Sequence, residues 1–157
     1  MKHSLLTFLL GVMISSCLSQ EVENENIALI DEFVQEMVFN QKISKSTINS
    51  YFDIANDNYE EMIPFFQSTF SDLQEKIGVK CSKQYQILSY KEAKKIDIIG
   101  ISSFEKGGYN KYPNAFFIVC GDTIMLPLIL EGKKIISFST ALKSSSGDPS
   151  KPAFINR

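Results

Sequence analysis

The side chains of this chain that could act as nucleophiles or soft metal ligands are its three cysteines, Cys17, Cys81 and Cys120. The single histidine is His3, inside a segment that is typical of an export leader. A mature chain without histidine cannot use Ser-His-Asp or Cys-His catalysis, or a histidine-ligated zinc or iron site. We therefore predict no catalytic residue, no metal and no cofactor.

Cys81 and Cys120 are 39 residues apart and form no Cys-x-x-Cys motif. Two thiols cannot complete a zinc site. In an oxidising compartment they could form one disulfide, whose loop would add roughly 4 kcal/mol of stability in the chain-entropy model. The alternative is two buried free thiols, which suits the apolar run around Cys120.

A glycine pair with aromatic neighbours is the strongest candidate for a ligand or partner contact. It comprises Phe104, Gly107, Gly108, Tyr109 and Tyr112. Flexible loop residues often carry binding functions. The favoured alternative is a hairpin tip whose aromatic rings fold back on the core.

Two further clusters have ordinary structural explanations. Phe65, Phe66 and Phe70 could line a pocket, but helical spacing favours a place in the core. Asp53 and Asp57 could lie one helical turn apart, as a general base or a calcium contact would need. No EF-hand spacing accompanies them, so solvated helix ends are the favoured interpretation.

The first 16 residues have the three parts of a secretory signal. Lys2 and His3 precede an apolar run from Leu5 to Ile14, which is too short to span a membrane. Ile14-Ser15-Ser16-Cys17 then resembles a bacterial lipobox. This resemblance implies cleavage before Cys17 and a diacylglycerol on its thiol, with fatty chains such as palmitate in the membrane. Ordinary signal cleavage after Ser19 is the competing interpretation.

The remainder is divided into a flexible acidic tether (17–26), one domain (27–143) and a disordered tail (144–157). The formal net charge is −2, and removing residues 1–16 takes away one lysine and no acid. Nucleic-acid binding needs a concentrated basic surface, so we expect none. The expected location is the cell envelope, at the outer membrane in preference to the inner, with the leaflet undetermined.

Hydrophobic spacing predicts helices in the first half of the domain. The expected helices cover 27–41, a short segment that opens at Ser44 or Ser46, and 59–77. Pro64 should kink or restart the third helix, and Gly78 should end it.

Strands are expected in the second half, at 84–90, 96–102, 115–120, 123–130 and 134–142. Gly121-Asp122 is a hairpin signal between two of them. Pro127 cannot donate a hydrogen bond to a neighbouring strand, so it predicts a bulge.

Helices followed by an antiparallel meander predict an α+β fold, with a bent sheet packed on the helices. The three-helix start and the closing turn at Gly132-Lys133-Lys134-Ile135 resemble the NTF2-like fold. That resemblance implies a cone-shaped sheet around a pocket. We expect a non-catalytic binding domain, whose partner is an envelope protein or a small apolar ligand. The alternatives are an NTF2-like hydrolase or isomerase that uses Asp and Tyr, and a structural subunit of an envelope complex.

Overall fold

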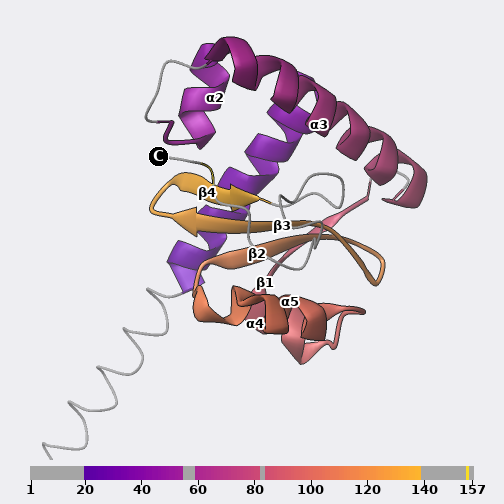
Figure 1. The fold of residues 1–157 in the computed structure, drawn as a ribbon. Helices are drawn as coiled ribbons and strands as arrows, with labels where there is room; N and C mark the ends of the chain where they lie inside the picture. Colours follow the sequence, from indigo (N-terminus) through magenta and orange to yellow (C-terminus); the bar gives the residue numbers. More distant parts are fainter. Residues whose placement is uncertain (1–19, 55–58, 82–83, 139–154, 156–157) are drawn as a thin grey trace, which may run out of the picture.

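The computed structural model describes residues 20–54, 59–81, 84–138 and 155. The fold is α+β, as predicted, with a four-stranded antiparallel sheet in the order β1-β2-β3-β4. The strands are β1 (Gln86–Ser89), β2 (Ala115–Cys120), β3 (Thr123–Glu131) and β4 (Lys134–Phe138). Figure 1 shows helices on both sides of this sheet.

The first layer of helices comes from the N-terminal half of the chain. A helix over 20–33 continues into the π-helix η1 (Val34–Phe39), and α2 (Lys45–Tyr51) and α3 (Tyr59–Cys81) follow. The predicted apolar stripe is confirmed, since Ile30, Phe33, Val34, Met37 and Val38 are all buried. Residues 20–26 were expected to be a tether, but they are helical and Asn26 is buried.

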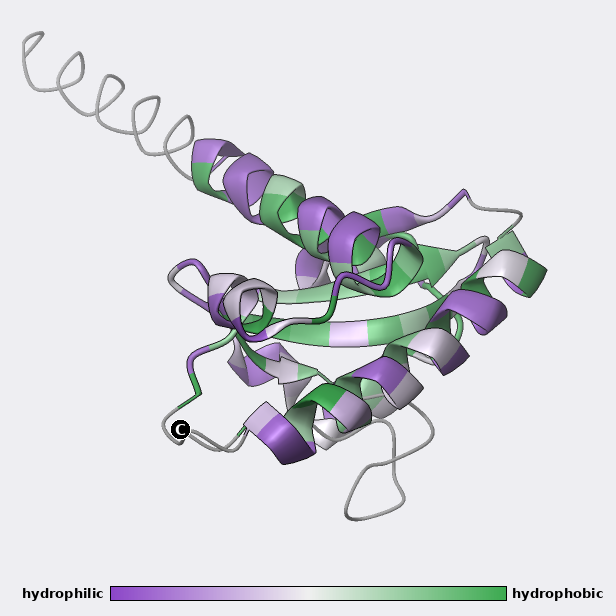
Figure 2. Ribbon diagram, turned by 90° about the horizontal axis from the view of Figure 1, so that it is seen from above, coloured by the Kyte–Doolittle hydropathy of each residue, from purple (hydrophilic) through white to green (hydrophobic). Residues whose placement is uncertain are grey.

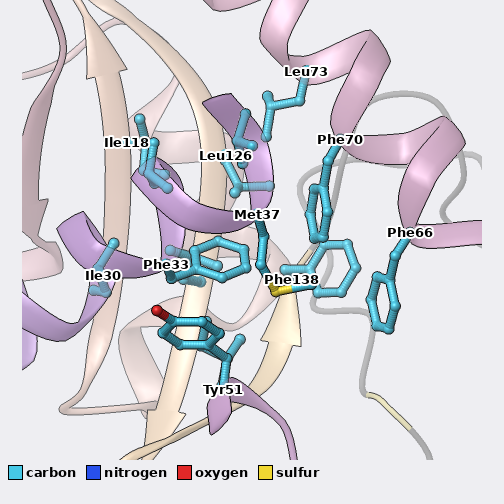
Figure 3. Close-up of a cluster of buried hydrophobic side chains, with 14 of the residues drawn as sticks. Ile30, Phe33, Met37, Tyr51, Phe66, Phe70, Leu73, Ile118, Leu126 and Phe138 are labelled. Carbon is cyan, nitrogen blue, oxygen red and sulfur yellow. The ribbon is translucent and has the colours of Figure 1, made fainter. Parts of the chain in front are cut away.

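The aromatic residues of the first layer form a continuous core with the sheet. The rings of Phe66 and Phe70 stack at 5.5 Å, and Phe138 of β4 lies 5.7 Å from Phe70. Figure 3 shows these rings pointing toward one another, with Met37 beside them. Phe66 and Phe70 are therefore core residues, as the favoured interpretation held, while Phe65 is 38% exposed.

α3 is longer than its sequence suggested. It continues through Pro64 and beyond Gly78 to Cys81, so the predicted restart and stop are wrong. Pro64 lies near the start of the helix, where one missing hydrogen bond is offset by the buried residues that follow. Beyond Gly78, the helix is held to the sheet through Cys81.

The second layer was missed by the sequence analysis. Residues 96–102, expected to be a strand, are a turn that leads into α5 (Ile101–Gly107), apart from one isolated bridge between Ile99 and Thr123. The charged run before it forms α4 (Tyr90–Lys95), and η2 (Tyr109–Lys111) follows α5. Together, α4, α5 and η2 cover the face of the sheet opposite to the first layer (Figure 1).

Alternate residues of β2 serve the two faces. Phe116 and Ile118 point into the first cluster, whereas Phe117 and Val119 belong to a second cluster. A strand buried on both faces is an uninterrupted apolar run, because neither face meets water. Figure 2, seen from the side of the first layer, shows that the strands are mostly hydrophobic and that the helices are more polar.

The closing meander follows the prediction in outline. Gly121-Asp122 turns β2 into β3, and β4 pairs with β3 after the turn at Gly132. Pro127 itself pairs in register with Phe117. The register of β3 against β2 shifts just before it, because Leu126 pairs with Ile118 and Ile124 with Val119, so the predicted irregularity is present in β3 but lies beside Pro127 and not at it.

Most of the expected C-terminal tail lies outside the described residues. Ile155 is the exception, because its backbone N–H donates to the Ile136 carbonyl at 3.0 Å and its side chain packs on the first cluster. The likeness to the NTF2-like cone remains a prediction.

Candidate functional site

The second layer gathers the residues that were predicted to contact a ligand or partner. Phe104 and Gly107 lie in α5, Gly108 links α5 to η2, Tyr109 opens η2, and Tyr112 follows it. The Gly107-Gly108 pair is thus the end of a helix and not a hairpin tip.

The aromatic rings of this segment do fold back on the core, as the favoured interpretation held. Phe104 lies edge-on to Tyr109 at 5.5 Å and to Phe117 at 5.4 Å. Tyr109 lies 5.7 Å from Phe117 and has no exposed surface. The site is therefore an aromatic cluster that joins α5 and η2 to the middle of β2.

Tyr109 carries the most unusual polar group of the cluster. Its hydroxyl is buried and has no hydrogen-bond partner among the described residues. Burial raises the pKa of this hydroxyl, so it keeps its proton. A buried polar group left without a partner costs about 1–3 kcal/mol, and most proteins avoid that cost.

Tyr90, at the start of α4, places a second hydroxyl near the same ring. Its ring lies 6.4 Å from Phe117, and its hydroxyl is also buried without a hydrogen bond of acceptable geometry among the described residues. Burial raises the pKa of Tyr90, and the nearby Glu105 raises it further. The Glu105 carboxylate and the Lys94 ammonium both lie close to this hydroxyl, and Lys94 lowers the pKa of Tyr90 where Glu105 raises it.

A surface ion pair connects α4 to α5. Lys94 Nζ lies 2.6 Å from Glu105 Oε1, and both side chains are substantially exposed. The hydrogen bond from Lys94 lowers the pKa of Glu105 and raises that of Lys94. Both groups are therefore charged at neutral pH, and they bridge the two short helices on their outer side.

The tyrosine–carboxylate pairs of the first layer have a different role. Tyr51 OH donates to Glu36 at 3.0 Å, and Tyr85 OH donates to Asp31 at 2.5 Å. Burial followed by these hydrogen bonds raises the pKa of Tyr85 to about 12 and raises that of Tyr51 as well. A general base needs a pKa near the working pH, so these tyrosines are donors that fix the first helix in place.

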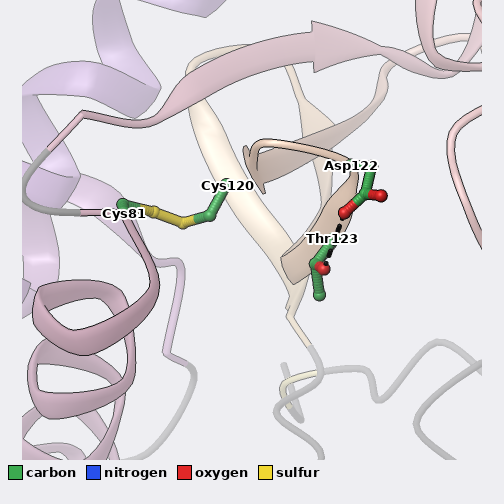
Figure 4. The surroundings of a disulfide bond; sticks show 4 residues. All are labelled: Cys81, Cys120, Asp122 and Thr123. Carbon is green, nitrogen blue, oxygen red and sulfur yellow. Dashed lines mark hydrogen bonds between the residues drawn. A yellow bond between two sulfur atoms is a disulfide. The ribbon is translucent and has the colours of Figure 1, made fainter.

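The structure joins Cys81 to Cys120 in a disulfide. Their Cα atoms are 5.0 Å apart, within the range that such a bond requires. Figure 4 shows the bond tying the end of α3 to the end of β2, next to the hairpin at Asp122 and Thr123. Cys17 lies outside the described residues.

The described residues offer little else that could bind a ligand chemically. They contain no group of three His, Cys, Asp or Glu side chains able to hold a metal ion. Asp53 is exposed, and Asp57 lies outside the described part of the chain. Two hollows lie on outer helical surfaces, one at the last turns of α3 and one beside residues 20–28.

Comparisons with known protein families, with curated proteins and with solved structures found no match. None of the helices described here is both long and apolar enough to cross a bilayer.

Sequence reasoning missed Tyr90, Phe117 and the helix α4. Ser89 accepts a hydrogen bond from the Glu92 backbone, and the Glu92 side chain accepts one from Ser89, which is a complete capping box. The pattern Ser-x-x-Glu in the sequence could have predicted that helix start. The uninterrupted apolar run of β2 could have predicted that a second layer covers the sheet.

Proposed function

We propose that this chain is a bacterial lipoprotein, acylated on Cys17 and held at the envelope, at the outer membrane in preference to the inner. Its folded domain binds an envelope protein or a small apolar ligand and does not catalyse a reaction. The leader sequence supports the anchor. The second layer supports the binding role.

The observation that carries the binding proposal is the exposure of two aliphatic side chains in the turn between α4 and α5. Ile96 is 57% exposed and Ile99 is 68% exposed. Both lie directly before α5, which carries part of the candidate site, and Asp97 between them has a left-handed backbone (φ 52°). Such a turn presents apolar surface at little cost to the core, which is how many binding loops are built.

The chemistry of the described residues weakens the alternative of an NTF2-like enzyme. The shifted tyrosines have raised pKa values and so hold their protons. The alternative of a structural subunit would call for a large continuous apolar patch. The exposed large apolar residues among those described are instead spread over several elements: Val22, Phe65, Val79, Ile96 and Ile99.

The anchor is tested by the Cys17→Ala variant of the full-length chain. We expect the parent to fractionate with membranes and to show the mass of the acylated mature protein, and the variant to lose both properties. An unchanged mass and membrane fraction would refute the lipid. A native N-terminus at Gln20 would also refute it and would indicate ordinary secretion.

The binding surface is tested by photo-crosslinking in intact cells. A crosslinking amino acid replaces Ile99, and the matched control replaces Val79, which is 78% exposed on the last turn of α3. We expect one dominant adduct of defined mass from position 99 and none from position 79. Equal or absent adducts at both positions would contradict a binding role for the second layer.

A further inference from the structure

We propose that α5 is a hinged lid over a site for a small, uncharged, apolar molecule that carries one hydrogen-bonding oxygen, and that the Tyr109 hydroxyl binds this oxygen. This inference deepens the proposed function, because it places a ligand class in the same second layer. Its test is independent of the lipid anchor and of crosslinking at Ile99.

Tyr109 has a hydroxyl whose hydrogen-bonding capacity is unused within the described residues. Its ring is enclosed by Phe104 and Phe117, and its hydroxyl finds no partner among the described residues. A phenylalanine would fill the same space without leaving a polar atom unpaired. A bound molecule that forms a hydrogen bond with this hydroxyl would explain why the residue is tyrosine and not phenylalanine.

A second tyrosine hydroxyl lies in the same aromatic surroundings. Tyr90 packs on the same Phe117 ring from α4, and its hydroxyl is likewise buried without a hydrogen bond within the described residues. Apolar walls with a few polar groups are the usual composition of small-molecule sites.

The helix α5, which covers this cluster, is short and is bounded by glycines. α5 has seven residues, and Ile101 is its only buried one. Glycines with left-handed backbones bound it on both sides, Gly100 at φ 87° and Gly108 at φ 103°. A Cβ at either glycine would meet nothing within 4 Å, so backbone conformation and not space accounts for glycine there. Two such positions around a short helix can absorb the backbone rotation of a hinge.

The chemical class of the ligand follows from the lining. The buried residues of the second cluster are Ala93, Ile98, Ile101, Tyr109, Ala115, Phe117, Val119 and Ile129, and none is charged. Lys94 and Glu105, on the outer side of the layer, are paired with each other. A charged ligand among the buried residues would therefore leave water without a free counter-charge, which is strongly unfavourable. A neutral ligand of about the size of phenol, with an alcohol, phenol or carbonyl oxygen, fits both the apolar lining and the tyrosine hydroxyl.

The experiment uses the mature chain and three probes: phenol, toluene as the match without oxygen, and benzoate as the charged match. Binding is followed by NMR shifts of amides in α5 and β2. We expect phenol to bind most tightly, toluene more weakly and benzoate not at all. Tyr109→Phe should lower the affinity for phenol about tenfold and leave that for toluene unchanged.

The control is Tyr51→Phe, whose hydroxyl already serves Glu36 in the first layer. It should leave the affinities for all three probes unchanged. Thermal unfolding provides a second readout without any probe. Tyr109→Phe should raise the melting temperature because it removes an unpaired buried hydroxyl, while Tyr51→Phe should lower it.

Three results would overturn the proposal. The first is no binding of phenol to the parent protein, and the second is equal phenol affinity in parent and Tyr109→Phe. The third is a lower melting temperature for Tyr109→Phe, since this would mean that the hydroxyl is already satisfied within the fold. If Tyr109→Phe fails to fold, the third result applies. A specific adduct at Ile99 beside any of these results would leave the proposed function standing without the ligand site.

Discussion

The two faces of the sheet are built in opposite ways. Among the described residues, the first face carries a cluster of 22 buried residues, in which strand side chains pack against helices from the first half of the chain, mainly the long helices over 20–39 and α3. The second face carries eight, mostly from the segment between β1 and β2 and its neighbouring strands. Its helices α4 and α5 have only six and seven residues.

This difference suggests that the first face provides most of the stability and that the second face can adapt its conformation. Helices of this length are not stable in isolation, so the second layer depends on its packing against β2. Regions with few buried contacts are the ones that open locally at low free energy. We infer that the first face holds the fold together and leaves the second free to bind.

The largest expected effect comes from emptying the first face. Phe70→Ala removes a ring with no exposed surface that stacks on Phe66, and should lower the free energy of unfolding by about 3–5 kcal/mol. Phe104→Ala, which removes a half-buried ring from the second face, should cost clearly less. Urea unfolding of both variants measures the difference, and equal losses would show that the two faces contribute alike.

The disulfide should have an effect of similar or slightly smaller size. It joins two cysteines that are 39 residues apart in sequence, and the loop it closes contains the whole second layer. Cys81→Ala with Cys120→Ala should cost up to about 4 kcal/mol. Amide exchange should accelerate more in α4 and α5 than in the first helix. A uniform acceleration would contradict a specific role in confining the second layer.

The helix caps provide a smaller and more local comparison. Ser89 caps α4 and is buried, whereas Ser44 caps α2 and is exposed. Ser89→Ala removes the hydroxyl half of a capping box at a buried position and should cost about 1–2 kcal/mol, and Ser44→Ala about 0.5–1 kcal/mol. Thermal unfolding of the pair checks this order, and a reversed order would mean that α2 depends more on its cap than α4.

The smallest effect is expected from alkaline pH. The pKa of Tyr85 is raised to about 12 in the fold, above its ordinary value near 10. The proton is therefore held more tightly in the native state, and this contribution to stability is complete below pH 10. It is lost as the pH rises toward 12. Tyr85→Phe should make the unfolding free energy fall less steeply between pH 10 and 12, and an unchanged slope would refute the assignment.

The sequence predicted the first face well because its signals are local and periodic. The stripe from Ile30 to Val38 repeats with helical spacing, and each of its apolar members is buried. The start of α2 at Ser44 was also predicted, and its hydroxyl accepts the Thr47 N–H. The end of α3 was not predicted correctly. Gly78 is a weak helix former, but the helix continues past it to Cys81, which is bonded to Cys120.

The second face was mispredicted for an identifiable reason. Residues 96–102 are apolar enough for a strand, and short apolar runs do not distinguish a strand from a buried helix by periodicity. The conformation of residues 96–102 is decided by the packing of Ile98 and Ile101 on Phe117 and Val119. That packing is a tertiary contact on the second face of the sheet. The candidate site was located in the right segment, but its hydroxyls, hinges and cover depend on how that segment folds back.

Alone, the sequence determined the leader pattern, the absence of histidine after residue 3, the α+β class and the apolar stripes, because each depends on residue type or on spacing along the chain. Only the tertiary structure decided that the sheet is covered on both faces, that Cys81 meets Cys120, and that the buried Tyr109 hydroxyl has no partner in the described part of the chain. These features depend on contacts between residues distant along the chain or on complete enclosure, which no local pattern specifies.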